Sequence, residues 1–250
     1  MVDPATGSDI FSAPASDAAD VDLAVRAAAD AFTTWGRTTP LERATALFKL
    51  ADVIEARADD LIAVESLNGG KPISATGDEI AASADCFRFF GGAARTMETQ
   101  GAGEYMEGYT SMLRREPVGV IASISPWNYP LMMAAWKIGP ALAAGCTVVL
   151  KPSDLTPMSS LLLAELSADI FPPGVFNVIC GDGATTGVAL TTHPLVEMIS
   201  VTGSVGTGKA IARAASDSLK RVHLELGGKA PVLVFDDADL QKVADSIKVG

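Results

Sequence analysis

The segment VTGSVGTGK at residues 201–209 has the composition of a phosphate-binding turn. A β-branched run precedes it and a helical pattern follows it, so its glycines fall between a strand and a helix. The free backbone N–H groups and the dipole at such a helix start attract a phosphate. A tight turn without a ligand explains the composition equally well. The candidate phosphate-binding residues are Gly203, Ser204, Val205, Gly206 and Thr207.

The same segment nearly matches the G-x-x-x-x-G-K-[ST] loop of nucleoside triphosphatases, with Gly203, Gly208 and Lys209 in place. The next position is Ala210, which has no hydroxyl to bind Mg²⁺. The loop also follows a late strand instead of the first one. A P-loop NTPase is therefore a distant alternative.

Two further strand ends carry side chains with catalytic chemistry. Glu225 ends a β-branched run and is followed by Leu226 and two glycines, so its carboxylate could act as a general base. Asn128 lies just past another strand, where its amide could donate to a developing oxyanion. Each residue alone is more simply a turn or surface residue.

Lys151 ends a buried apolar run and is followed by Pro152, Ser153 and Asp154. This order could direct an ammonium and a carboxylate at the hydroxyls of a sugar. A solvated lysine is the simpler interpretation of this turn alone. Because polar or glycine-rich turns also end the other predicted strands, we favour a binding function for the whole set.

These turns are positioned by a predicted α/β fold. Short β-branched runs alternate with helical patterns from Gly119 onward, which indicates a Rossmann-like parallel sheet with helices on both faces. The amino-terminal hundred residues read as helices, with Asp17 and Asp20 as capping candidates for the first helix and Thr39-Pro40 as the start of the second. Alternation around Gly108 predicts a small protruding β-hairpin at 104–115, which could pack on a neighbouring subunit.

The composition excludes several classes of protein. A net charge of −11 over 250 residues argues against a nucleic-acid partner or an anionic membrane. The apolar stretch at 131–150 is interrupted by Lys137 and Pro140, which favours a buried segment over a membrane span. The three cysteines are scattered, so we expect no disulfide, no metal site and a cytoplasmic location; the start shows no signal peptide.

Four motifs occur in one order: SPWNYP at 125–130, KPSD at 151–154, TGS at 202–204 and LELGGK at 224–229. With them the chain resembles the aldehyde dehydrogenase superfamily over nearly its whole length. The segments at 87–90, 103–105 and 127–137 are most similar to the branch that oxidises γ-aminobutyraldehyde and betaine aldehyde.

The resemblance implies a role for each motif. Asn128 would complete the oxyanion hole and Glu225 would be the general base. The KPSD turn would hold the adenosine ribose, and Ser204 with its neighbours the pyrophosphate. The backbone of Ser125, Pro126, Trp127 and Leu226 would line the nicotinamide channel. The family more often has Glu where this chain has Asp154, yet an acid there still repels a 2′-phosphate, so NAD is expected over NADP.

The resemblance also implies a mechanism, in which a cysteine thiolate adds to an aldehyde, hydride passes to NAD and water hydrolyses the thioester. That cysteine would lie beyond Gly250, because Cys86, Cys146 and Cys180 are outside its motif. The expected substrate is an ω-aminoaldehyde such as 4-aminobutanal. Its cation would meet the side chains of Tyr129, Trp136 and Asp78.

The expected domains are an NAD-binding domain at 1–103 and 116–225, an oligomerisation arm at 104–115, and the start of a truncated catalytic domain at 226–250. The complete enzyme is expected to be a homo-oligomer. The alternative is a non-catalytic fragment that binds a nucleotide or drives oligomerisation.

Overall fold

The computed structural model describes residues 1–97 and 101–247. The amino-terminal third is helical: α1 (Ala18–Trp35), α2 (Pro40–Ala56), α3 (Ala58–Gly69) and α4 (Ile73–Arg95). Capping boxes begin two of these helices: the side chains of Asp17 and Thr39 accept from the backbone N–H three residues on, and their own backbone N–H groups donate to the side chains of Asp20 and Glu42. The predicted starts of both helices are therefore confirmed.

A five-stranded parallel sheet follows, in the spatial order β5-β4-β3-β6-β7. Its strands are β3 (Val120–Ile124), β4 (Thr147–Lys151), β5 (Phe176–Val178), β6 (Val196–Gly203) and β7 (Arg221–Leu226). The connecting helices are α5 (Pro130–Ala143), α6 (Met158–Ser167), the π-helical turn η1 (Gly183–Gly187), α7 (Val188–Thr192) and α8 (Val205–Ser216). The strand order reverses between β3 and β6, and ligands of such sheets bind at that point.

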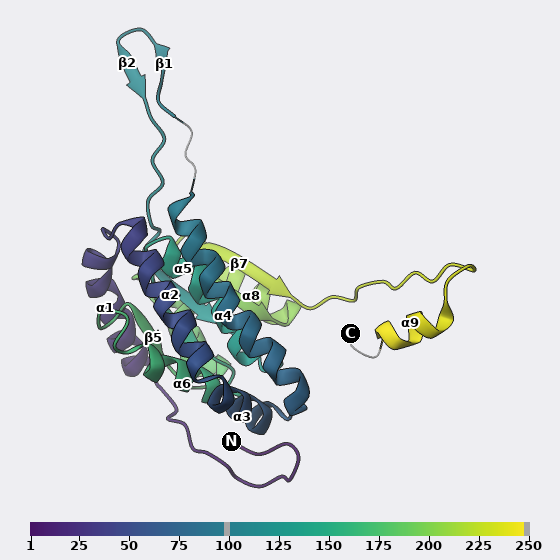
Figure 1. Ribbon diagram of the computed structural model, residues 1–250. Coiled ribbons are helices and arrows are strands. Elements are labelled where there is room, and N and C mark those ends of the chain that lie inside the picture. The colour runs from purple at the N-terminus through teal and green to yellow at the C-terminus, as the bar shows by residue number, and fades with distance from the viewer. Residues whose placement is uncertain (98–100, 248–250) are drawn as a thin grey trace.

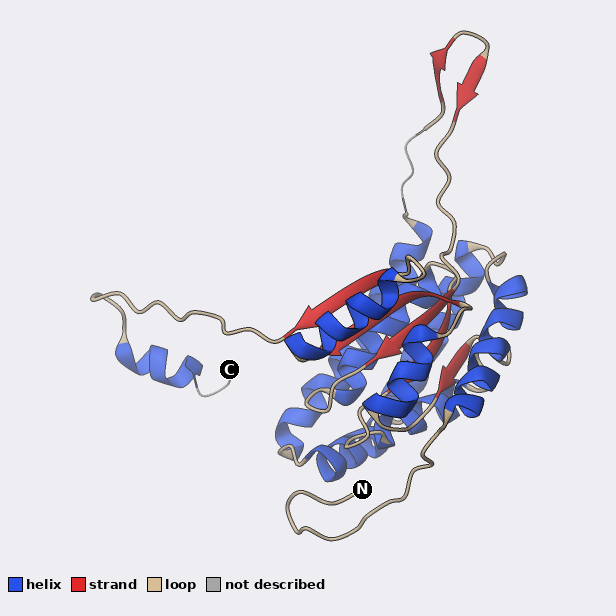
Figure 2. Ribbon diagram, turned by 180° about the vertical axis from the view of Figure 1, so that it is seen from behind, coloured by secondary structure: helices blue, strands red, loops and turns tan. Residues whose placement is uncertain are grey.

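Helices cover both faces of the sheet, as predicted (Figures 1 and 2). Ile121, Val148 and Leu150 bury one face in a core shared with α2, α4, α5 and α6. The alternate residues Val120 and Val149 bury the other face against α1, α7 and α8. The apolar stretch at 131–150 forms α5, a turn and β4, and no helix in the described ranges is long and apolar enough to cross a membrane.

Two segments extend from this body (Figure 1). The predicted hairpin is confirmed as the antiparallel strands β1 (Gly103–Met106) and β2 (Tyr109–Ser111), joined through Gly108 at φ +78°. After β7 the chain runs outward to α9 (Leu240–Ile247), which buries none of its residues.

Candidate active site

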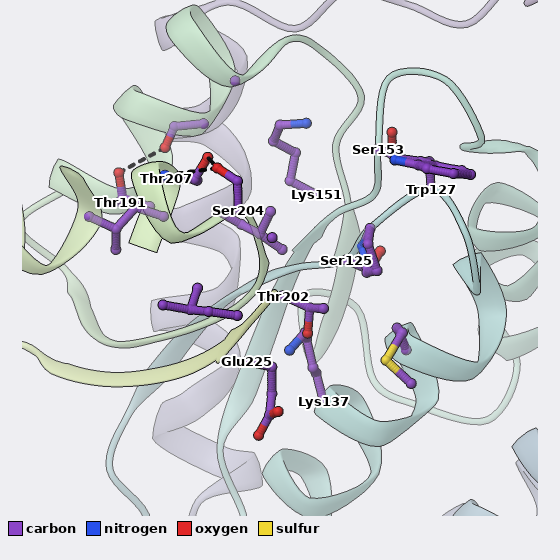
Figure 3. A pocket seen from close by; sticks show the side chains of 18 of the residues that line it. Ser125, Trp127, Lys137, Lys151, Ser153, Thr191, Thr202, Ser204, Thr207 and Glu225 are labelled. Carbon is purple, nitrogen blue, oxygen red and sulfur yellow. Dashed lines mark hydrogen bonds between the residues drawn. The ribbon is translucent and has the colours of Figure 1, made fainter. Parts of the chain in front are cut away.

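A pocket of about 870 Å³ lies at the carboxyl ends of β3, β4, β6 and β7. It brings together most of the residues that the sequence singled out. Those that line it are Ser125, Pro126, Trp127, Asn128, Trp136, Lys151, Ser153, Asp154, Gly203, Ser204, Thr207, Glu225 and Leu226. Figure 3 shows Lys151 near the glycine-rich turn at one end, and Lys137 near Glu225 at the other.

Five predicted residues do not line this pocket. The carbonyl of Pro152 accepts a hydrogen bond from the Lys151 ammonium at 2.9 Å, so Pro152 holds that side chain without lining the pocket itself. Val205 and Gly206 form the exposed first turn of α8, beside the lining residues. Asp78 lies exposed on α4, and the ring of Tyr129 is covered by the Lys71 ammonium at 4.0 Å from its centroid.

The glycine-rich turn has the geometry of an anion site. Ser204 caps α8, because its Oγ accepts from the backbone N–H of Thr207 at 3.1 Å. Val205 and Gly206, the first two residues of α8, are exposed, and the helix offers no carbonyl four residues earlier to accept from their N–H groups. The first turns of α8 also lie close to β7, since a Cβ added at Gly208 would lie 2.6 Å from Leu226 Cδ2.

Lys151 is only 4% exposed, although it carries a charge. Burial lowers the pKa of its ammonium, while the carboxylates of Asp154 and Asp182 act in the opposite direction. An ammonium has three N–H donors, and Pro152 takes one of them. The remaining donors, together with the acceptor at Asp154, suit the paired hydroxyls of a ribose.

The turn that carries Asn128 is held from several sides. Thr156 donates to the carbonyl of Trp127 at 3.2 Å, and the N–H of Leu131 donates to the carboxylate of Glu65 at 2.7 Å. Glu65 is buried in α3, and this burial raises the pKa of its carboxyl group. Asn128 itself is exposed to the pocket, so its amide is positioned to serve a ligand.

Glu225 lies in a polar group that the sequence did not reveal. The nearest ring nitrogen is Nε2 of His223, at 3.3 Å from its Oε1. Lys137, from α5, is buried, and this desolvation lowers the pKa of its ammonium to about 8, although the charge of Glu225 opposes the fall. The Lys137 ammonium can therefore exchange a proton with a ligand near neutral pH.

The turn at 181–183 is one of the strand ends for which the sequence favoured a binding function, but sequence reasoning did not name the residues of η1 and α7 that follow it. Gly183, Gly187, Val188 and Thr191 line the pocket there. Asp182 caps η1, because its Oδ1 accepts from the backbone N–H of Thr185 at 2.5 Å. The available signal was the pair Gly181 and Gly183 after β5, which predicted a turn but gave no indication of a π-helix.

A dinucleotide fits the polar groups that the pocket presents. The hydroxyl oxygens of Ser125 and Thr202 are buried without a hydrogen-bond partner in the described part of the chain, and both residues line the pocket. A buried hydroxyl without a partner is costly, so we expect ligand atoms or water to satisfy it. An ammonium, a helix start and free hydroxyls match the phosphates and sugars of NAD.

Known proteins with the same sequence pattern support this reading. The model of the aldehyde dehydrogenase family matches residues 1–250. Betaine aldehyde dehydrogenase 1 of Oryza sativa subsp. japonica is 43% identical over 98% of the chain and 50% of its own length. Aminoaldehyde dehydrogenase 2 of Zea mays is 41% identical, again over 98% of the chain and 50% of its own length.

Solved structures agree with the sequences. PnpE from Pseudomonas sp. WBC-3, also solved in complex with NAD, superposes with a TM-score of 0.95 at 46% identity, over 98% of this chain and 50% of that one. Betaine aldehyde dehydrogenase from Staphylococcus aureus in complex with NAD⁺ gives 0.93 at 35%, over 98% and 49%. The chain thus spans about half the length of these relatives. From its fold, its motifs and these matches, the chain belongs to the aldehyde dehydrogenase family.

Proposed function

We propose that the pocket binds NAD and that this chain provides the cofactor side of an enzyme that oxidises an aldehyde to a carboxylic acid. The observation that carries the proposal is the convergence of Lys151, Asp154 and the start of α8 on one pocket at the strand-order reversal. The NAD complexes of two structural relatives support it. Asp154 favours NAD over NADP, because its carboxylate would repel a 2′-phosphate.

In this proposal each polar group has one task. Lys151 and Asp154 hold the ribose, while Ser204 and the first turn of α8 hold the pyrophosphate. When bound, NAD supplies the acceptor for a hydride. When the nucleophile adds to the aldehyde carbon, the aldehyde oxygen becomes an oxyanion, and Asn128 donates its amide N–H to it. Glu225 takes a proton from the water that hydrolyses the thioester.

The thiol nucleophile is not one of the three cysteines of this chain. Cys86, Cys146 and Cys180 are all buried, and none lines the pocket. Burial raises the pKa of the Cys86 thiol to about 12, so almost no thiolate exists there at neutral pH. We therefore place the nucleophile outside residues 1–250, in the remainder of a complete enzyme.

We propose an ω-aminoaldehyde such as 4-aminobutanal as substrate. The names of the rice and maize relatives support a cationic aldehyde. Of the three candidate substrate residues, Trp136 lines the pocket and is 56% exposed, so its ring is free to contact a cation. Tyr129 already contacts the Lys71 ammonium, and Asp78 lies outside the pocket, which makes both weaker candidates.

The hairpin is the proposed oligomerisation arm of a homo-oligomer. Tyr105, Met106 and Tyr109 expose 64–84% of their surface, and a neighbouring subunit would cover them. We place the enzyme in the cytoplasm, because its cysteines are free thiols. The alternative remains a non-catalytic fragment that binds the nucleotide or oligomerises, and it shares the same cofactor pocket.

Calorimetric titration of residues 1–250 with NAD tests the cofactor assignment. Lys151→Ala should weaken binding about 10- to 100-fold, because a charge-assisted hydrogen bond is worth about 1.5–3 kcal/mol. Lys49→Ala is the matched control, since Lys49 is exposed on α2 outside the pocket. Tight NAD binding that survives Lys151→Ala and Ser204→Ala together would show that NAD does not bind in this pocket as proposed, and no NAD binding by the parent chain would remove the cofactor assignment.

A further inference from the structure

A row of polar side chains crosses the sheet beside the pocket. Ser200 on β6 pairs in register with His223 on β7, and Thr202 pairs with Glu225. Residues two apart on a strand project from the same face, so these four side chains share one face. Lys137 reaches the same face from α5, where its Nζ donates to Ser200 Oγ at 3.3 Å.

The donors and acceptors of this row fix its direction. The Lys137 ammonium only donates, so Ser200 Oγ accepts from it. The carboxylate of Glu225 only accepts, so it favours the imidazole proton on Nε2, which leaves Nδ1 of a neutral ring to accept from the Ser200 hydroxyl at 3.1 Å. A neutral imidazole that accepts at Nδ1 carries its proton on Nε2. That Nε2–H lies next to Oε1 of Glu225, at 3.3 Å.

We infer that His223 is a positioning residue for Glu225, holding the carboxylate of the proposed general base through an imidazole that Ser200 and Lys137 orient. The inference rests on the proposed function for Glu225 as the base. The Glu225 side chain is 62% exposed, so without a partner it would occupy several rotamers. His223 contacts Oε1, and in this inference Oε2 is the oxygen that takes the water molecule.

A serine, a histidine and a carboxylate in contact also compose a hydrolase triad, but this geometry does not fit one. Ser200 is 6% exposed in the middle of β6 and does not line the pocket. Its hydroxyl oxygen already accepts a hydrogen bond from the Lys137 ammonium, and the same hydroxyl contacts His223. A nucleophile must reach a substrate, so Ser200 acts as the support of the imidazole instead.

Histidine nitrogen spectra of residues 1–250 test the direction of the row. The chain has two histidines, so His193→Gln leaves His223 alone in the spectrum. We expect the Nε2–H tautomer, with Nδ1 at the chemical shift of a hydrogen-bonded acceptor. Ser200→Ala should move Nδ1 to the shift of a free acceptor. Ser123→Ala is the matched control, because Ser123 is the buried in-register neighbour of Ser200 on β3 and its hydroxyl has no hydrogen-bond partner among residues 1–97 and 101–247.

Three-bond couplings of Glu225 then test the positioning itself. We expect one dominant χ1 rotamer in the parent chain, rotamer averaging in His223→Ala, and recovery in His223→Gln, whose amide can donate from near the position of Nε2. An Nδ1–H tautomer, equal effects of Ser200→Ala and Ser123→Ala, or couplings unchanged in His223→Ala would each overturn the inference. The NAD titration reports separately on the proposed function, because His223→Ala leaves Lys151 and Ser204 intact.

Discussion

Replacing Lys137 with methionine should stabilise this chain at neutral pH. The side chain is 6% exposed, and burial lowers the pKa of its ammonium from 10.5 to about 8. The folded protein therefore bears the cost of a desolvated charge whenever the lysine is protonated. Methionine fills a similar volume and has no charge, so it removes this cost.

The size and the pH dependence of the effect follow from that shift. Below about pH 8 the lysine is charged in both states, and the folded state bears the whole cost. Between about 8 and 10.5 the unfolded chain binds more protons than the folded one, so the stability of the parent chain rises with pH in that window. At about 1.4 kcal/mol per pH unit the cost is on the order of 3 kcal/mol. Lys137→Met also loses the hydrogen bond to Ser200, which reduces the expected stabilisation by about 1 kcal/mol.

We therefore expect Lys137→Met to add on the order of 2 kcal/mol to the free energy of unfolding at pH 7, and less at pH 10. Urea denaturation of residues 1–250 at both pH values measures the difference. Lys49→Met, at an exposed position of α2, corrects for the general effect of losing a cation. A Lys137→Met variant that is less stable than Lys49→Met at pH 7, or equally stabilised at both pH values, would refute the reasoning.

Two further predictions concern packing. Gly174→Ala should cost more than about 2 kcal/mol, because Gly174 has φ +85° and its added Cβ would collide with the carbonyl of Ala27 in α1. Gly92→Ala, in the last turn of α4 where an added Cβ meets no other atom, should instead gain about 0.5–1 kcal/mol. Equal melting temperatures for the two variants would contradict this. Iodoacetamide at pH 8 should leave Cys86 unmodified in the folded chain and alkylate it in urea, because burial raises the pKa of its thiol to about 12; mass spectrometry of the digested chain would reveal early labelling.

Much of the fold could be predicted from local patterns. The caps at Asp17 and Thr39 and the hairpin around Gly108 each depend on neighbouring residues, and all are confirmed. The alternation after Gly119 predicted parallel strands without their spatial order, which depends on where each helical connection returns the chain: α5 leads from β3 to β4 on one side, and η1 with α7 leads from β5 back to β6 on the other side of β3. Local rules therefore identified the elements, and tertiary packing decided their order.

The site was only partly predictable, for the same reason. The turns at strand ends could be found because each contains its own polar residues. His223 could not be found in this way. Its importance comes from its contact with Ser200 on the neighbouring strand, which Lys137 of α5 contacts in turn, and no local motif records those contacts. Tyr129 was expected to contact the substrate, and its ring contacts Lys71, a residue 58 positions earlier in the sequence, which no local motif records either. The roles assigned to the site residues stay predictions.

The charge of the chain explains why the pocket needs buried lysines. With a net charge of −11, the surface as a whole repels an anionic ligand, so long-range steering cannot deliver one. Salt screens that repulsion beyond about 8–10 Å, which leaves capture to groups that touch the ligand. Lys151 and the start of α8 provide such groups inside the pocket, where little solvent weakens them. Stability alone would select against a desolvated ammonium. The buried ammonium of Lys151 at the end of β4 is therefore better explained by ligand binding than by a contribution to folding.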